Sequence, residues 1–151
     1  MELQRWSGDH FEDCELKALG VRIFLGHNGA PCPVPAERIK DFTIVDTNGV
    51  HAVDMQFCGC YHSVGGSHAR IQLIRAGLLP PTHVRPISAF TFDVLDTFHL
   101  LTLQGKTNAY DFYLSLAHKS DNTGLLDIKV TPCFFDSLVT ENLRSSAISN
   151  S

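Results

Sequence analysis

The stretch FTIVDTNGVHAVDMQFCGC, residues 42–60, decides the expected fold. Its two apolar runs flank Asn48-Gly49, a favoured residue pair of the type I′ turn, so we expect a β-hairpin over residues 42–57. Successive side chains of a strand point to opposite faces of the sheet. On this rule the core-directed set of the second strand is His51, Val53, Met55 and Phe57, while Cys58 and Cys60 share the other face.

The segments on either side of this hairpin predict a short sheet followed by helices. Residues 16–26 alternate as a strand does, and residues 27–35, HNGAPCPVP, have the composition of a loop. Residues 67–77 suit a short helix with Ile71 and Ile74 facing inward, and residues 78–86 suit an extended connector. Apolar residues at helical spacing predict a helix over residues 88–105, and Asn108 caps a second helix that continues to residue 119. The expected fold class is therefore α+β: a small antiparallel sheet with a zinc-knuckle-like end and a packed helical hairpin.

Length and composition describe an ordinary intracellular domain. The chain has 151 residues, 44% of them hydrophobic and 19% charged, which suits one domain with a real core. Its formal net charge of −4 argues against nucleic-acid binding through bulk electrostatics, which needs a basic surface. No targeting segment or membrane-spanning run is recognisable, and in an intracellular setting the five cysteines are expected to be mostly reduced.

Four cysteine and histidine side chains are candidates for a zinc site. Zinc prefers four tetrahedral ligands drawn from thiolate sulfur and imidazole nitrogen. Cys58 and Cys60 could supply two of them, and His27 and Cys32, in the loop after the first strand, could supply the others. The alternative ligands are His51, His62 and His68; the parity of the strand disfavours His51.

Two other interpretations of these cysteines stay open from the residues alone. Free cysteine is often buried as a small apolar residue, so core packing explains the pair without any ligand. A catalytic thiol needs a histidine base and an orienting carboxylate, and Cys58, His51 and Asp54 or Asp46 could be named for these roles. In that assignment His51 would be the base and Cys58 the nucleophile. The two residues fall on opposite faces of one strand, so they should point apart.

The order of motifs resembles a known family. The series begins with Trp6 and Phe11 in a W-x4-F pattern and runs without a gap through LKALGVRIFLGHNGAPC, DTNGVHAVDMQFCGC, QLIRAGLLPPT, AFTFDVLDTF and NAYDFYLSLAHKSDNTG. It is similar to the second CxC-type cysteine-cluster domain associated with the Kyakuja–Dileera–Zisupton (KDZ) transposases of fungi, over roughly residues 3–124. The resemblance implies that Cys58 and Cys60 are the CxC pair, that His27 and Cys32 are the paired ligands, and that His51 also matches a family position.

The resemblance also implies a function and a domain division. We expect a cysteine-cluster domain over residues 1–124 and a divergent, partly disordered tail over residues 125–151, with no transposase catalytic domain in this chain. The implied function is a non-catalytic, zinc-binding accessory module of a transposase-derived nuclear protein that recognises DNA or protein. The acidic net charge favours a transposase domain or another protein as the partner. The alternatives are a Cys-dependent hydrolase or thiol oxidoreductase, and a degenerate metal-free fragment without function.

Overall fold

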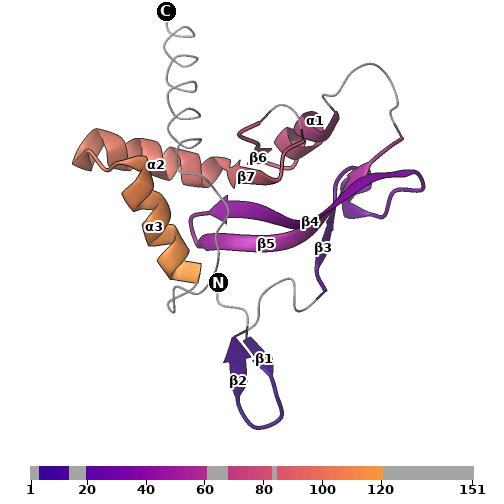
Figure 1. The fold of residues 1–151 in the computed structure, drawn as a ribbon, viewed down its shortest axis with the longest axis horizontal. Helices are drawn as coiled ribbons and strands as arrows, with labels where there is room; N and C mark the ends of the chain where they lie inside the picture. Colours follow the sequence, from indigo (N-terminus) through magenta and orange to yellow (C-terminus); the bar gives the residue numbers. More distant parts are fainter. Residues whose placement is uncertain (1–3, 14–19, 61–67, 83–84, 121–151) are drawn as a thin grey trace, which may run out of the picture.

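The computed structural model of the chain describes residues 4–13, 20–60, 68–82 and 85–120 (Figure 1). Its elements in chain order are β1 (Gln4–Trp6), β2 (Phe11–Asp13), β3 (Arg22–Phe24), the 3₁₀ turn η1 (His27–Gly29), β4 (Pro35–Asp46), β5 (Gly49–Cys58), α1 (His68–Arg75), β6 (Leu78–Leu79), β7 (Ser88–Thr91), α2 (Phe92–Gly105) and α3 (Ala109–Ser120). The α+β class predicted from the sequence is confirmed. The tail over residues 125–151 lies outside the described residues, so its disorder and the division at residue 124 stay predictions.

Five strands form one mixed sheet in the order β3-β5-β4-β7-β6. The expected antiparallel hairpin is its centre, because β4 pairs antiparallel with β5, and β6 pairs antiparallel with β7. The sheet also contains two parallel pairs, β3 with β5 and β4 with β7, which the sequence did not predict. The short β1–β2 hairpin forms a separate sheet in which Trp6 pairs with Phe11, and Figure 1 shows it below the five strands.

The turn between β4 and β5 differs from the predicted type I′ turn. Asp46 pairs with Gly49, so the two loop residues are Thr47 and Asn48 instead of Asn48 and Gly49. A type I′ turn requires positive φ at both central residues, and neither Thr47 nor Asn48 has one. Gly49 follows with a φ of 142°, and a Cβ at this position would collide with the Ser120 side chain of α3. Glycine is thus required at the first residue after the two-residue loop, whereas the expected turn placed it at the second residue of the loop.

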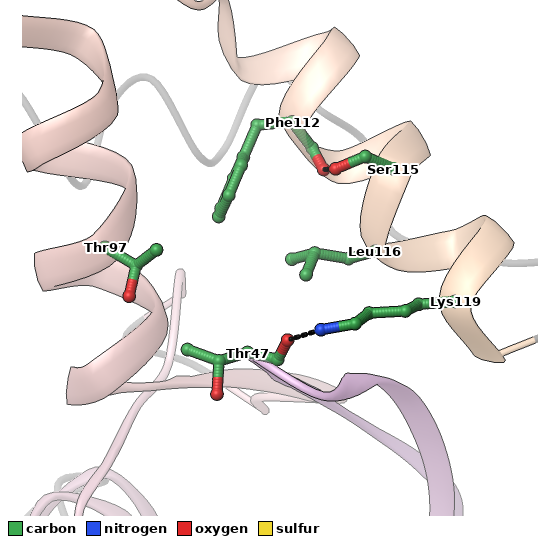
Figure 2. A pocket seen from close by; sticks show the side chains of 6 residues that line it. All are labelled: Thr47, Thr97, Phe112, Ser115, Leu116 and Lys119. Carbon is green, nitrogen blue, oxygen red and sulfur yellow. Dashed lines mark hydrogen bonds between the residues drawn. The ribbon is translucent and has the colours of Figure 1, made fainter. Parts of the chain in front are cut away.

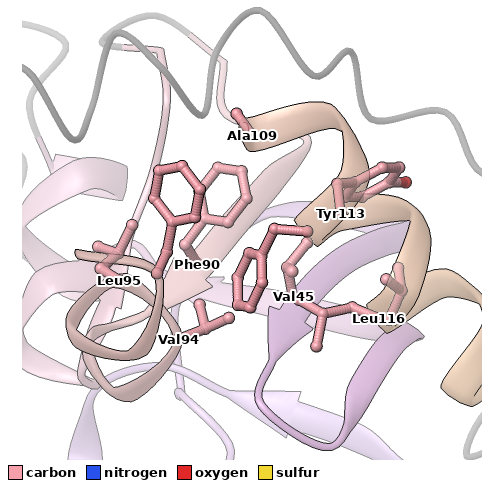
Figure 3. Close-up of a cluster of buried hydrophobic side chains, with 10 residues drawn as sticks. Val45, Phe90, Val94, Leu95, Ala109, Tyr113 and Leu116 are labelled. Atoms are coloured by element: carbon pink, nitrogen blue, oxygen red, sulfur yellow. The ribbon is translucent and has the colours of Figure 1, made fainter. Parts of the chain in front are cut away.

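The two faces of the sheet are covered by different helices. Consecutive residues of β4 and β7 point to opposite faces, which separates Val45 and Phe90 from Ile44 and Ala89. Helices α2 and α3 cover the Val45 face, and the side chains that form this core are Val45, Val50, Phe90, Val94, Leu95, Phe98, Ala109, Phe112, Tyr113 and Leu116 (Figure 3). Helix α1 covers the other face, where the core consists of Leu25, Phe42, Val53, Met55, Phe57, Leu73, Leu78 and Ala89.

The helix expected from Ser88 begins four residues later, at Phe92. Residues Ser88–Thr91 form β7 instead, because Ala89 and Phe90 are fully buried between β4 and β6, where strand pairing satisfies their backbone groups. Thr91 is the N-cap of α2, and its side chain accepts a hydrogen bond from the Val94 amide. The apolar residues already recur at helical spacing before Phe92, so their pattern did not show where the helix begins.

The two shorter helices give mixed outcomes. The predicted cap of α3 is confirmed, since the Asp111 amide donates to Asn108 Oδ1 at 2.8 Å. The predicted inward face of α1 is wrong, because Ile71 and Ile74 are exposed and Leu73 is fully buried. A helix this short contacts the sheet through a narrow stripe, so the choice of stripe depends on tertiary packing.

A matched pair of leucines in α2 tests this packing. Leu95 is 5% exposed within the α2–α3 core, whereas Leu103 on the same helix is 67% exposed. Because Leu95→Ala removes buried methyl groups and leaves a cavity, it should lower the free energy of unfolding by about 2–5 kcal/mol. Leu103→Ala should change it by less than about 0.5 kcal/mol. Urea unfolding of both variants measures the difference, and equal effects would contradict the assigned helix orientation.

Candidate metal centre

Four donor atoms from three separate chain segments meet at one end of the sheet. His27 comes from η1, Cys32 from the loop before β4, and Cys58 and Cys60 from the end of β5. The imidazole Nε2 and the three Sγ atoms all lie within 4.8 Å of one another. His27 Nε2 lies 3.3 Å from both Cys58 Sγ and Cys60 Sγ. Cys32 Sγ lies 3.4 Å from Cys58 Sγ and 3.2 Å from Cys60 Sγ.

These separations fit a tetrahedral ion. With Zn–S bonds of about 2.3 Å and a Zn–N bond of about 2.0 Å, neighbouring ligands of a tetrahedron stand roughly 3.5–3.8 Å apart. The four separations of 3.2–3.4 Å given above are slightly shorter than these edges. Three thiolates and one imidazole form the Cys₃His donor set of structural zinc sites. This group of side chains could therefore hold a metal ion.

His27 lies in a turn whose backbone dihedral angles are unfavourable for most residues other than glycine. Gly26 has a φ of 83°, and a Cβ there would come within 2.9 Å of Cys58 Cβ. His27 and Asn28 follow with φ values of 47° and 54°, and the Gly29 and Ala30 amides close the turn on Gly26 and His27. Left-handed backbone costs free energy for a histidine, so surrounding contacts must hold it there. The turn places the imidazole directly over the end of β5.

The glycine between Cys58 and Cys60 is required by close packing. Its φ is not in the left-handed region, so backbone conformation does not explain why this residue is glycine. A Cβ on Gly59 would instead approach the Val34 carbonyl oxygen to 2.7 Å and the Ala36 amide nitrogen to 3.2 Å. The Gly59 amide donates to that same Val34 carbonyl at 2.9 Å. The absent side chain lets the two segments approach closely enough for Cys32 to reach the other thiols.

A glutamine of α1 holds the backbone of Cys58 from the other side. The Cys58 amide donates to Gln72 Oε1, and Gln72 Nε2 donates to the Cys58 carbonyl, each at 2.9 Å. This paired bond satisfies both backbone groups of a buried cysteine where β5 ends. Sequence reasoning did not find Gln72, because only the tertiary position of α1 brings it to the cluster.

The thiols influence one another's protonation. Burial raises the pKa of Cys32, but hydrogen bonds with Cys60, the Gly59 backbone, Cys58 and the Val34 backbone outweigh it and lower the pKa to about 6. The hydrogen bond to Cys32, burial and the other thiol raise the pKa of Cys60 to about 11. Cys32 therefore loses its proton more readily than an ordinary cysteine, and Cys60 holds its proton more tightly. A bound cation would favour release of the remaining protons, since metal ligands must be deprotonated.

Comparison with known proteins gives one match. A family model described as CxC2 like cysteine cluster associated with KDZ transposases matches residues 16–124. The chain belongs to this family. No curated protein and no solved structure matches the chain. The family is defined as a cysteine cluster associated with transposases, and the matched region contains all four residues of the candidate metal centre.

The other residues considered for the CxC2 site do not join the cluster in the described part of the chain. His51 stands seven residues before Cys58 on β5, roughly 23 Å away along an extended strand. Its Nε2 lies 2.8 Å from Asn48 Oδ1, and burial lowers its pKa. The proposed pairing of His51 with Cys58 as base and nucleophile is thus not formed. His62, Cys14 and Cys133 lie outside the described residues, as does the side chain of His68.

A pocket lies at the opposite end of the hairpin. Its volume is about 420 Å³, and its walls come from the β4–β5 turn, α2 and α3: Thr47, Thr97, Phe112, Ser115, Leu116 and Lys119 (Figure 2). The Lys119 ammonium donates to the Thr47 carbonyl at 2.9 Å. The hydroxyls of Thr97 and Ser115 donate to carbonyls of their own helices. These polar groups are thus already bonded within the fold.

Within the described ranges, no helix combines the length and apolar character needed to cross a bilayer.

The paired bond from Gln72 gives a test of how Cys58 is positioned. Gln72→Ala removes both hydrogen bonds to the Cys58 backbone without touching a thiol. Removing such outer support of a metal ligand usually costs 10–100-fold in affinity, so we expect a loss of about that size. Gln104→Ala, at an exposed site on α2, is the matched control. Competition against a chromogenic chelator measures both affinities, and equal values would show that Gln72 does not position the ligand.

Proposed function

We propose that the chain is a non-catalytic, zinc-binding accessory module of a KDZ transposase-derived nuclear protein. The observation that supports it best is the convergence of His27 Nε2 with the Sγ atoms of Cys32, Cys58 and Cys60 within 4.8 Å. We assign these four residues as the zinc ligands. Zinc suits the site because soft thiolate ligands in a tetrahedral arrangement favour it over hard, oxygen-seeking cations.

The donor count favours a structural role for the ion. Catalytic zinc sites use three protein ligands and keep one position open for water or substrate, whereas structural sites are closed by four. Here four protein donors are available, so an ion bound to all of them would have no open position. It would join the loop after β3 to the end of β5 and so supply folding free energy, of order 10 kcal/mol in zinc-finger peptides.

The family and the net charge support the recognition role. A cysteine cluster associated with transposases, with four donors available to close a metal site, suits a module that acts by binding another macromolecule. The chain carries a formal net charge of −4, which opposes the long-range attraction that non-specific DNA binding requires. We therefore favour a protein partner, such as a transposase domain, over DNA.

Metal content tests the zinc assignment directly. Purified wild-type chain should contain about one zinc per chain by mass spectrometry, while the Cys58→Ser, Cys60→Ser double variant should contain none and melt at a lower temperature. Cys14→Ser and Cys133→Ser, which change cysteines outside the four ligands, should keep the metal. A well-folded wild-type chain without metal would refute the zinc-binding function.

A thiol enzyme is the second candidate, because the pKa of Cys32 is lowered to about 6 and His27 Nε2 lies 3.3 Å from Cys58 Sγ. Iodoacetamide labelling near pH 6 distinguishes the two. A zinc-bound cluster should label slowly and accelerate after a chelator removes the ion, because coordination occupies the sulfur lone pairs. Fast labelling of a metal-free protein, unchanged by chelator, would favour the thiol enzyme.

A further inference from the structure

Among the described residues, the helices leave one half of a sheet face uncovered. On β5, Val50, Asp54 and Gln56 alternate onto the same face; α2 and α3 cover Val50, while Asp54 and Gln56 are partly exposed. On the neighbouring strands Arg22 pairs with Asp54, and Arg38 pairs with Gln56, so both arginines share this face. We define the open sheet surface by Arg22, Arg38, Asp54 and Gln56, together with Lys40, whose charge acts on Asp54.

Positive charge dominates this surface. Arg22, Arg38 and Lys40 are all exposed, and Asp54 is the carboxylate among them. Arg38 forms a hydrogen-bonded ion pair with Asp54, and this contact, with the nearby charges of Arg38, Arg22 and Lys40, lowers the pKa of Asp54. β4 also carries Glu37 and Asp41, but the charges that lower the pKa of Asp54 are those of Arg38, Arg22 and Lys40. Three cations thus surround one carboxylate in a chain that is acidic overall.

We propose that the open sheet surface binds an acidic segment of a partner protein, through the side chains of Arg22, Arg38 and Lys40. The inference rests on the proposed recognition function and names its surface and the chemistry of its partner. The Arg38–Asp54 pair supports it, because it is an instance on this surface of an arginine holding a carboxylate. Arg22 lies 5.9 Å over the Phe24 ring, which keeps its guanidinium near the sheet.

The extent of the surface favours a short acidic segment over duplex DNA. The surface carries three cations, and Arg38 is already paired with Asp54, so few phosphates could be neutralised, and strong DNA binding depends on many such contacts. The negative charge on the rest of the chain would repel a long polyanion, whereas a peptide needs to approach only this surface. At physiological salt, charges are screened beyond about 8 Å, so the local cations determine the contact.

The surface is joined to the metal centre through β4 and β5. Pro35 pairs with Cys58 at the same end of the hairpin where Arg38 pairs with Gln56. Gln56 Nε2 donates to the Ala36 carbonyl at 2.7 Å and so fixes this segment of β4 on β5. An ion at the centre would hold the end of this surface in place, while the binding cations themselves are not ligands.

Fluorescence anisotropy of the full-length chain with three labelled probes tests the proposal. The probes are poly-glutamate, poly-glutamine and a DNA duplex. Poly-glutamate should bind, its affinity should fall as salt rises, and poly-glutamine should not bind. Each of Arg22→Gln and Lys40→Gln should weaken poly-glutamate binding about two- to fivefold, the range expected for an exposed ion pair. Arg75→Gln, which removes an exposed cation from α1, should leave it unchanged.

Several results would overturn the proposal. Absence of poly-glutamate binding, or an equal loss in the Arg75→Gln variant, would show that the open sheet surface is not the site. Tighter binding of the duplex with the same dependence on Arg22 and Lys40 would assign the surface to nucleic acid. Metal content is measured on the same samples. A chain that lacks zinc yet binds poly-glutamate through these residues would refute the zinc assignment while leaving this inference intact.

Discussion

The antiparallel pairing of β4 with β5 runs from Asp46 opposite Gly49 at the turn to Pro35 opposite Cys58 at the far end, and both ends of the molecule depend on it. At the turn end the hairpin provides Val45 and Val50 as the surface on which α2 and α3 pack. At the far end the close approach of Gly59 to Val34 brings the segment containing Cys32 beside the CxC pair. A slip of one residue in this register would move core side chains to the opposite face and separate the thiols.

The two ends of the hairpin are stabilised in different ways. The turn end has a full apolar core, including the Phe98 and Phe112 rings with centroids 5.2 Å apart. At the far end α1 covers one face, while the other face carries charged and polar side chains and the loop with η1 keeps two non-glycine residues at positive φ. At this end an ion bound by the four candidate ligands would add a cross-link that holds the loop against the strand. The four candidate ligands lie at this end of the hairpin, away from the core formed with α2 and α3.

The sequence predicted the parts of the fold that local patterns determine. Alternation in VHAVDMQF placed Val53, Met55 and Phe57 in the core, and the cap at Asn108 was correct. The structure brings together His27, Cys32, Cys58 and Cys60, the four residues first considered for zinc. The start of α2, the buried stripe of α1 and the role of Gln72 were missed, because each depends on which strand or helix lies opposite. The reason for Gly59 was also missed, since the close contact with Val34 is between segments that are distant in sequence.

A closed metal centre and an open charged surface on the same two strands suggest how their roles divide. Four protein donors would leave an ion without a free position, so the ion itself would not contact a partner. The side chains that can do so are those that the ordered strands present to solvent, and on this face they include Arg22, Arg38 and Lys40. An ion bound at the cluster would order these strands in advance and so lower the entropy lost when a partner binds. Recognition by such a module would therefore depend on the metal through the order of β4 and β5, even though no ligand of the metal touches the partner.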